Sequence, residues 1–189
     1  MAGFDGFDPT HAVRFDLPHG SVTAGGAERH VLLSCAALDD LVLVAGSEAA
    51  AAVGRGLGAS IGKRIAARLG GASGVRGASI DDVVAEVAGE LAIVGLGAAS
   101  IERWGRALVV AIERPAVSDL PFLASIVEGL LEAATGARVH CASLGRDGVT
   151  TVRFLVASER TIGRARALLE QGLAWGDVLA RVQAKGDGA

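Results

Sequence analysis

The chain has 189 residues and a formal net charge of −3 at pH 7. That length suits one domain with a hydrophobic core, and the charge argues against nucleic acid as the main partner. Hydrophobic residues make up 51% of the sequence, yet no apolar run reaches the roughly 18 residues of a membrane-spanning helix, so we expect no transmembrane segment.

The two ends of the chain differ from its middle. The first residues lack the basic and apolar regions of a secretory signal, and two cysteines form no disulfide framework, which together predict a cytoplasmic protein. Residues 1–28 are rich in Gly, Asp, His and Pro without sustained periodicity, and we expect an N-terminal tail or edge segment there. Residues 29–185 are predicted to form a single α+β domain, and residues 186–189 a disordered C-terminus.

The domain should begin with a long helical segment. Ser34 is the expected cap of a helix that begins near Ala36, and Gly46 should break or kink it. Beyond Gly46, two rows of residues recur every four positions on adjacent flanks of one helix face. The small row is Gly46, Ala50, Gly54, Gly58, Gly62 and Ala66, and the apolar row is Val53, Leu57, Ile61, Ile65 and Leu69.

A row of small residues lets another backbone, or a long apolar molecule, come close to the helix. Because each glycine inside a helix costs about 1 kcal/mol relative to alanine, several glycines together suggest such a close approach. Two interpretations stay open. The small row either packs inside the chain's own core, or it forms a dimer or ligand surface with Gly54, Gly58 and Gly62 as the dimer contact.

The remaining patterns predict an antiparallel sheet. In chain order they are a helix that Ser79 caps, strands at 99–104 and 107–112, a helix from Asp119 to Gly136, strands at 139–144 and 149–156, and helices at 159–171 and 177–182. Asp147-Gly148 between apolar runs is a strong hairpin signal. The order predicts the α+β class, with a four-stranded antiparallel sheet of two hairpins covered by helices.

Several basic residues lie on or just after the striped helix: Arg55, Lys63, Arg64, Arg68 and Arg76. We interpret them as a solvated face rather than a surface for an acidic partner or a membrane.

Catalytic and metal-binding motifs are not found. Gly56, Gly58 and Gly62 have the look of a dinucleotide fingerprint, but they lie inside a helix instead of at a strand-to-helix turn. His140 and Cys141 are neighbours in a strand, so their side chains point to opposite faces of the sheet. Cys141 is expected to be a small core residue. We therefore predict no enzyme, no cofactor and no bound metal.

From about Ala50 to Val156 the chain resembles the acyl-binding small subunit of TRAPP, the transport protein particle that tethers vesicles. It also resembles the wider superfamily that holds the 4-vinyl-reductase domain, and its composition is that of a bacterial member. The matching pieces are Gly58-x-x-Ile61-Gly62-x-Arg64-Ile65, Ile101-Glu102-Arg103-Trp104, the apolar helix from Phe122 to Ala134, and the segment from Asp147-Gly148-Val149-Thr150 to Phe154.

The resemblance implies a non-catalytic fold that dimerises through its helices and can hold an apolar tail in a narrow channel. Gly77 stands where the eukaryotic subunit carries its acylated cysteine, so no thioester can form there, and the second metal-binding cysteine of many 4-vinyl-reductase domains falls near Val152. The main hypothesis is a homodimeric scaffold that docks a protein partner such as a small GTPase.

The alternative hypothesis is a sensor domain for a small hydrophobic ligand, an acyl chain or a hydrocarbon. Its apolar channel would lie between the long helix and the sheet, with Gly77 at or near the mouth. The lining residues would be Val53, Leu57, Ile61, Ile65, Leu108 and Val110. We expect this channel to be closed by its own side chains, because natural protein interiors tolerate few voids.

Overall fold

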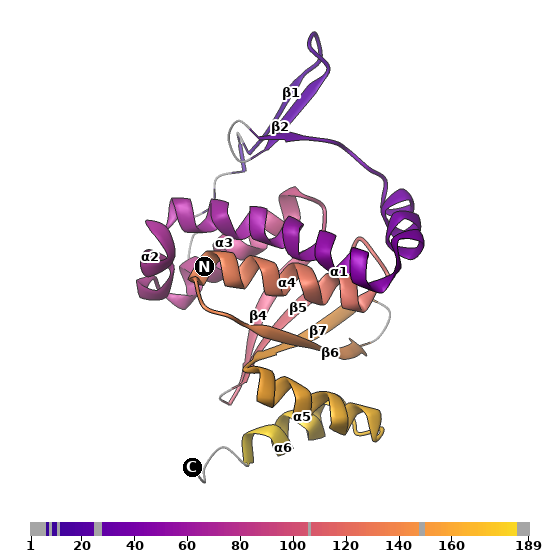
Figure 1. Cartoon of the computed structure of the whole chain (residues 1–189). Coiled ribbons are helices and arrows are strands. Elements are labelled where there is room, and N and C mark those ends of the chain that lie inside the picture. Colours follow the sequence, from indigo (N-terminus) through magenta and orange to yellow (C-terminus); the bar gives the residue numbers. More distant parts are fainter. Residues whose placement is uncertain are drawn as a thin grey trace.

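The computed structural model describes residues 7, 9–10, 12–24, 28–105, 107–147 and 150–184 (Figure 1). Its strands are β1 (Val13–Asp16), β2 (Ser21–Ala24), β3 (Arg29–His30), β4 (Ala98–Trp104), β5 (Ala107–Glu113), β6 (His140–Asp147) and β7 (Thr151–Ala157). Its helices are α1 (Cys35–Arg68), α2 (Gly71–Gly77), α3 (Ile80–Ile93), α4 (Leu120–Thr135), α5 (Glu159–Glu170) and α6 (Trp175–Ala184).

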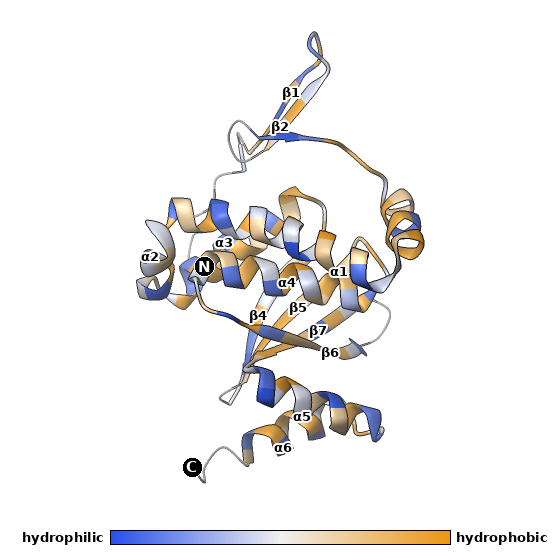
Figure 2. Ribbon diagram, viewed as in Figure 1, coloured by the Kyte–Doolittle hydropathy of each residue, from blue (hydrophilic) through white to orange (hydrophobic). Residues whose placement is uncertain are grey.

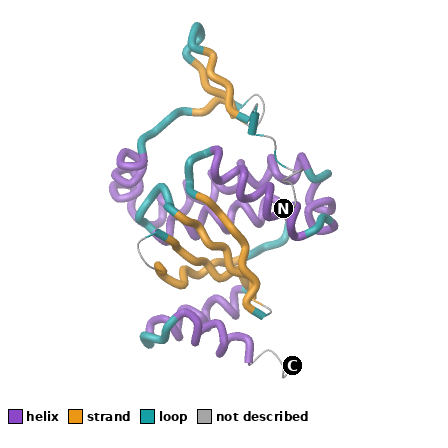
Figure 3. Tube along the Cα trace, turned by 180° about the vertical axis from the view of Figure 1, so that it is seen from behind, coloured by secondary structure: helices purple, strands orange, loops and turns teal. Residues whose placement is uncertain are grey.

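The main sheet has four antiparallel strands in the order β4-β5-β7-β6. The two hairpins join through β5 and β7, and helices lie on both faces (Figures 1 and 3). Helices α1 and α4 are on one side of the sheet, and α5 and α6 are on the other. The predicted α+β class and the sheet of two hairpins covered by helices are confirmed.

Each face of the sheet has its own hydrophobic core, because neighbouring residues of a strand point to opposite faces. In β5, Val110 and Ile112 lie in the core under α1 and α4, whereas Val109 lies in the core under α5 and α6. Strand β7 divides in the same way, with Phe154 in the first core and Leu155 in the second. The central strands are therefore buried on both faces.

Helices α1, α3 and α4 each begin at the side-chain cap that the sequence predicts. Ser34 accepts a hydrogen bond from the Ala37 amide, Ser79 from Asp82 and Asp119 from Phe122, each satisfying an amide that the first turn leaves unpaired. Gly46 interrupts α1 with φ 75° and ψ 165°. That backbone conformation is strained for residues with a Cβ, so glycine can supply the kink there.

Helices α1 and α4 pack in close contact through glycine. A Cβ added to Gly54, Gly58 or Gly62 would clash with Ser125 Oγ, Ile126 O and Leu130 O, and one added to Gly129 would clash with Arg55 O. The expected dimer contact through Gly54, Gly58 and Gly62 is therefore wrong, because α4 of the same chain already covers these residues. The small row serves the chain's own core.

The N-terminal part forms a second, three-stranded antiparallel sheet in the order β1-β2-β3. The boundary expected between residues 28 and 29 lies inside this region, because β3 pairs with β2. The C-terminal residues 186–189 lie outside the described part of the chain. Among the described helices, none has the length and apolarity needed to cross a bilayer.

Candidate functional site

The residues expected to line one apolar channel are not brought together. Ile61 and Ile65 are 3% and 0% exposed and lie in the first core with Val110, whereas Val53 and Leu57 are 54% and 43% exposed. Gly77 ends α2 at the surface, with open space where a Cβ would lie. Leu108 is half-buried.

Helix geometry explains why the apolar row divides. At about 3.6 residues per turn, a step of four residues turns about 40° past a full turn, so a four-residue row winds around the helix. Over the three steps from Val53 to Ile65 the row leaves solvent and enters the core. The expected burial of Val53 and Leu57 against the sheet is therefore wrong, whereas Ile61 and Ile65 lie in the first core with Val110.

The space between α1, α4 and the sheet is filled by side chains. Phe122, Leu123, Ile126 and Leu130 of α4 are each 1% exposed and pack in the same core as Ile65. Neither of the two cavities described next lies between these side chains and the sheet.

The first cavity lies on the opposite side of the sheet, against α5 and α6, and we call it the α5/α6 cavity. Its volume is about 270 Å³, and it is lined by Ala107, Leu155, Val156, Ala157, Thr161, Val182 and Gln183. Five of these seven residues are apolar, and Thr161 and Gln183 supply the polar groups. The Thr161 hydroxyl lies 3.0 Å from Ser158 Oγ at the start of α5.

An aromatic and charged cluster adjoins the α5/α6 cavity. Gln183 Nε2 donates a hydrogen bond to the Trp104 carbonyl oxygen, which links the cavity wall to the cluster. The rings of Trp104 and Trp175 meet edge to face with centroids 5.1 Å apart. Trp104 Nε1 donates to Glu102 Oε2 at 2.8 Å, and Arg153 Nε donates to the same oxygen at 3.0 Å.

The Glu102 carboxylate and the Arg153 guanidinium carry the charges of this cluster. The hydrogen bonds from the Arg153 guanidinium hold the pKa of the Glu102 carboxyl below its usual value of 4.5, although partial burial opposes that shift. Arg153 also stacks on the Trp175 ring, with its guanidinium carbon 5.1 Å from the centroid. The cluster therefore fixes the position of both tryptophans beside the cavity.

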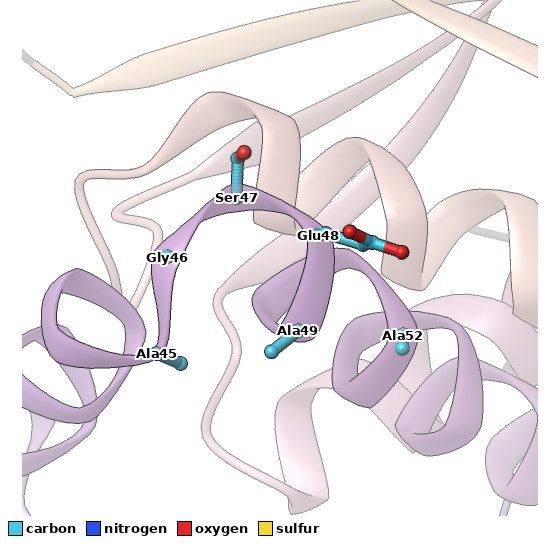
Figure 4. A pocket seen from close by; sticks show the side chains of 6 residues that line it. All are labelled: Ala45, Gly46, Ser47, Glu48, Ala49 and Ala52. Atoms are coloured by element: carbon cyan, nitrogen blue, oxygen red, sulfur yellow. The ribbon is translucent and has the colours of Figure 1, made fainter.

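The second cavity is a shallow notch at the kink of α1, and we call it the kink notch (Figure 4). Its volume is about 510 Å³, and its lining residues are Ala45, Gly46, Ser47, Glu48, Ala49 and Ala52. All of them belong to one helix, so the notch has no opposite wall to enclose a small molecule. The smaller α5/α6 cavity, with walls from the sheet and two helices, is the better candidate for a ligand.

A buried ion-pair network was not expected from the sequence. Arg64 Nη2 lies 2.7 Å from Glu90 Oε2, and Arg68 bridges Glu90 and Glu86 at 2.6 Å to each. Glu86 and Glu90 are buried, and Arg64 Nη1 also reaches Glu28 at 3.1 Å. Burial lowers the pKa of Arg68, but its bonds to the two glutamates outweigh burial and raise that pKa above its ordinary value.

This network joins α1, α3 and the residue before β3, and each of its acids has an arginine partner. It is therefore a structural element that fixes the helices. The expectation of a solvated face is wrong for Arg64, whose side chain is only 11% exposed, whereas Arg68 is exposed although it is paired with both glutamates. The sequence does contain a signal for this network. The two arginines on α1 are four residues apart, and so are the two glutamates on α3, which places each pair on one face of its helix.

Cys141 is a core residue, as expected. Its side chain is fully buried, and its amide donates to Glu128 Oε1 at 2.7 Å. Burial, and after it the Glu128 carboxylate, raise the pKa of the thiol well above its usual range. Within the described residues no group of three or more acidic, histidine or cysteine side chains could hold a metal ion. That purified protein carries no tightly bound metal stays a prediction, which elemental analysis would check.

No protein-family model matches the chain, and no curated protein is similar to it in sequence. A solved structure that is similar in fold is the phenol-responsive sensory domain of the transcription activator PoxR, crystallised with phenol. The match covers 77% of this chain and 84% of that one, at 17% sequence identity and a TM-score of 0.56. At this identity the likeness shows the fold alone. The resemblance to the TRAPP small subunit and the 4-vinyl-reductase domain stays a prediction.

Proposed function

We propose that this chain is a sensory domain that binds a small, uncharged and mainly apolar molecule in the α5/α6 cavity. The observation that carries the proposal is the cavity itself, which combines an apolar wall with two polar side chains at defined positions. Ligand sites in proteins have this composition, because apolar surface supplies affinity and a few polar groups fix orientation.

The volume and the lining limit the size and charge of the ligand. About 270 Å³ is just below the range of roughly 300–1,000 Å³ that is usual for ligand pockets, which favours a single ring or a short chain. None of the described residues that line the cavity is charged, and an unpaired charge is costly to remove from water. A neutral molecule with one hydroxyl or carbonyl group fits best, with Thr161 and Gln183 as its partners.

The structural likeness supports this proposal. The similar domain of PoxR is described as phenol-responsive, and phenol is a neutral single ring with one hydroxyl group. Phenol is therefore the first probe to test here, beside toluene as a partner without a hydroxyl group. The proposed ligand site does not lie where the acyl channel was expected, because the α5/α6 cavity is on the face of the sheet away from α1.

The two tryptophans provide a built-in reporter. They are the only tryptophans in the sequence, and they contact each other beside the cavity. Binding of phenol should change their fluorescence, and isothermal titration calorimetry should give the affinity. Ala157→Leu, which fills the cavity from β7, should abolish both signals, whereas the control Ala98→Leu at the exposed start of β4 should keep them.

A second variant tests the polar side chains of the α5/α6 cavity. Thr161→Val keeps the shape of the side chain but removes its hydroxyl group. One hydrogen bond contributes about 0.5–1.5 kcal/mol, so phenol should bind about 2- to 10-fold more weakly to this variant, with toluene unaffected. If neither probe nor any other small neutral ring changes the fluorescence of the wild-type protein or releases heat, the cavity is not the site.

A scaffold that docks a protein partner is the second candidate function. The observation that favours it is the group of exposed aliphatic side chains in the first turns of α1, Leu41, Leu43 and Val44, because exposed apolar groups of this kind mark contacts with other proteins. A small GTPase as that partner stays a prediction, which a pull-down with purified small GTPases in both nucleotide states would test.

A further inference from the structure

The segment from Val31 to Val44, which we call the apolar arm, exposes six large aliphatic side chains within fourteen residues. They are between 56% and 85% exposed, and they are Val31, Leu32, Leu33, Leu41, Leu43 and Val44. Figure 2 shows this stretch as mainly hydrophobic where it leads from β3 into the first turns of α1. Scattered single apolar residues are normal on a surface, but a contiguous group of this size marks an interaction site.

The first turns of α1 are apolar on two sides, and among the described residues the body of the protein packs against one of them. Leu38 and Val42, one turn apart, pack into the first core. Asp39 Oδ1 accepts a hydrogen bond from the Ser118 amide at 2.8 Å, which fixes this helical segment to the loop before α4. Leu41 and Val44 lie on another side and are exposed. The apolar side of a helix is usually buried against another surface, so a second apolar side calls for a second partner.

The exposed surface continues past the kink of α1. The kink notch, with its small residues Ala45, Ala49 and Ala52, follows directly after Val44. Val53 and Leu57 extend the apolar surface by another turn. The hollow of small residues (Figure 4) thus follows directly along the chain after the exposed aliphatic side chains of the arm. Such a surface is complementary to itself, which is what a two-fold symmetric contact requires.

We propose that a second copy of this chain covers the apolar arm and the kink notch in a symmetric homodimer. The exposed apolar area of the arm agrees with a second copy as its partner. At on the order of 100 Å² of apolar surface per fully exposed aliphatic side chain, the six residues of the arm present roughly 400 Å² in each copy. Two copies supply about 800 Å², close to the apolar part of a standard interface of about 1,200–2,000 Å².

The charges near this surface favour a protein over a lipid membrane. Asp40 within the arm and Glu48 in the notch are both exposed. Helices that lie on membranes carry Lys and Arg beside their apolar face, because anionic lipids attract them. The acidic border therefore disfavours an anionic bilayer. The proposal does not depend on a ligand in the α5/α6 cavity, which lies on the opposite side of the sheet.

Sedimentation velocity of the purified chain at micromolar concentration tests the proposal, with matched glutamate substitutions. Leu43→Glu and Val44→Glu change side chains that are exposed in the monomer, so the monomer should fold and give the wild-type circular dichroism spectrum. The control is Leu17→Glu, which is 83% exposed in the turn after β1 and lies outside the apolar arm. Wild type and the control should be dimers, and the two arm variants should be monomers.

The native cysteines allow a second readout. Cys35 is exposed at the start of α1, and Cys141 is buried. A spin label added to the folded protein at a dilution that dissociates the dimer will therefore attach to Cys35 alone. Pulsed electron paramagnetic resonance should give one defined distance between two copies in wild type and in Leu17→Glu, and no such distance in Val44→Glu.

Three results would overturn the proposal. Wild type could be a monomer throughout the micromolar range. The arm variants could remain dimers with an unchanged distance between labels, which would place the interface elsewhere. Wild type could be a monomer that floats with lipid vesicles of either zwitterionic or anionic composition, which would make a membrane the occupant of the arm.

Discussion

Gly58 tests the close packing of α1 against α4. In Gly58→Ala the new Cβ would clash with Ile126 O and would lie 2.8 Å from Leu130 N. Both atoms belong to the backbone of α4 and cannot rotate away, so the helices must separate locally by roughly 1 Å, which forfeits a large part of each van der Waals contact. We expect the cost to be at the upper end of overpacking, about 3 kcal/mol.

Helix propensity opposes that cost. Alanine is about 1 kcal/mol more favourable than glycine inside a helix, so the net destabilisation should be about 2 kcal/mol. For a chain of this size that corresponds to a fall in Tm of about 4–8 °C. The measurement is thermal unfolding followed by circular dichroism, supported by urea titration.

Gly163→Ala in α5 is the matched control. Gly163 is exposed, and an added Cβ would meet nothing within 4 Å. This variant gains helix propensity without a clash, so its Tm should rise by about 2–4 °C. The reasoning fails if Gly58→Ala is as stable as wild type, since α4 then does not approach α1 as closely as the structure has it.

Glu90→Gln removes the buried charge that faces two arginines, and it should lower the free energy of unfolding by about 3 kcal/mol in urea titration, whereas exposed Glu170→Gln should change it little. Because the folded-state pKa of Glu102 lies below its unfolded value of 4.5, the stability from this carboxylate is present above that pH and is lost as the pH falls through the folded-state pKa. Glu102→Gln should therefore show a weaker loss of Tm than wild type when the pH is lowered below about 4.5. The raised pKa and the burial of Cys141 predict that a thiol reagent modifies only Cys35 in the folded monomer, and both cysteines after denaturation.

The comparison of two surfaces on α1 shows why its function was difficult to assign from sequence. Glycine at every fourth position indicates that another backbone comes close to the helix. The pattern is the same whether that backbone belongs to a helix of the same chain or to a second chain. In the fold, α4 occupies the glycine face. The surface available to a second copy is instead the apolar arm, whose leucines and valines resemble core residues in sequence.

The sequence by itself determined the strands of the main sheet and the helices other than α2, because their signals are local, but it did not predict α2 or the strands β1 to β3. Ser34, Ser79 and Asp119 cap the next turn of their own helices, Gly46 supplies a backbone conformation at one position, and alternation assigns the faces of β5 and β7. Strand pairing through two hairpins follows from the same short-range information.

Only the tertiary structure decided which faces meet. Whether a glycine row is inside or between chains, and whether Arg64 is solvated or bonded to Glu90, depends on residues far apart in the sequence. Because a four-residue row winds around its helix, Val53 lies in solvent and Ile65 lies in the core. The packing of α4 against α1 sets the residue at which the row passes from solvent into the core. The α5/α6 cavity was not predicted at all, because a void is a property of the packing between the sheet and two helices and has no residue pattern of its own.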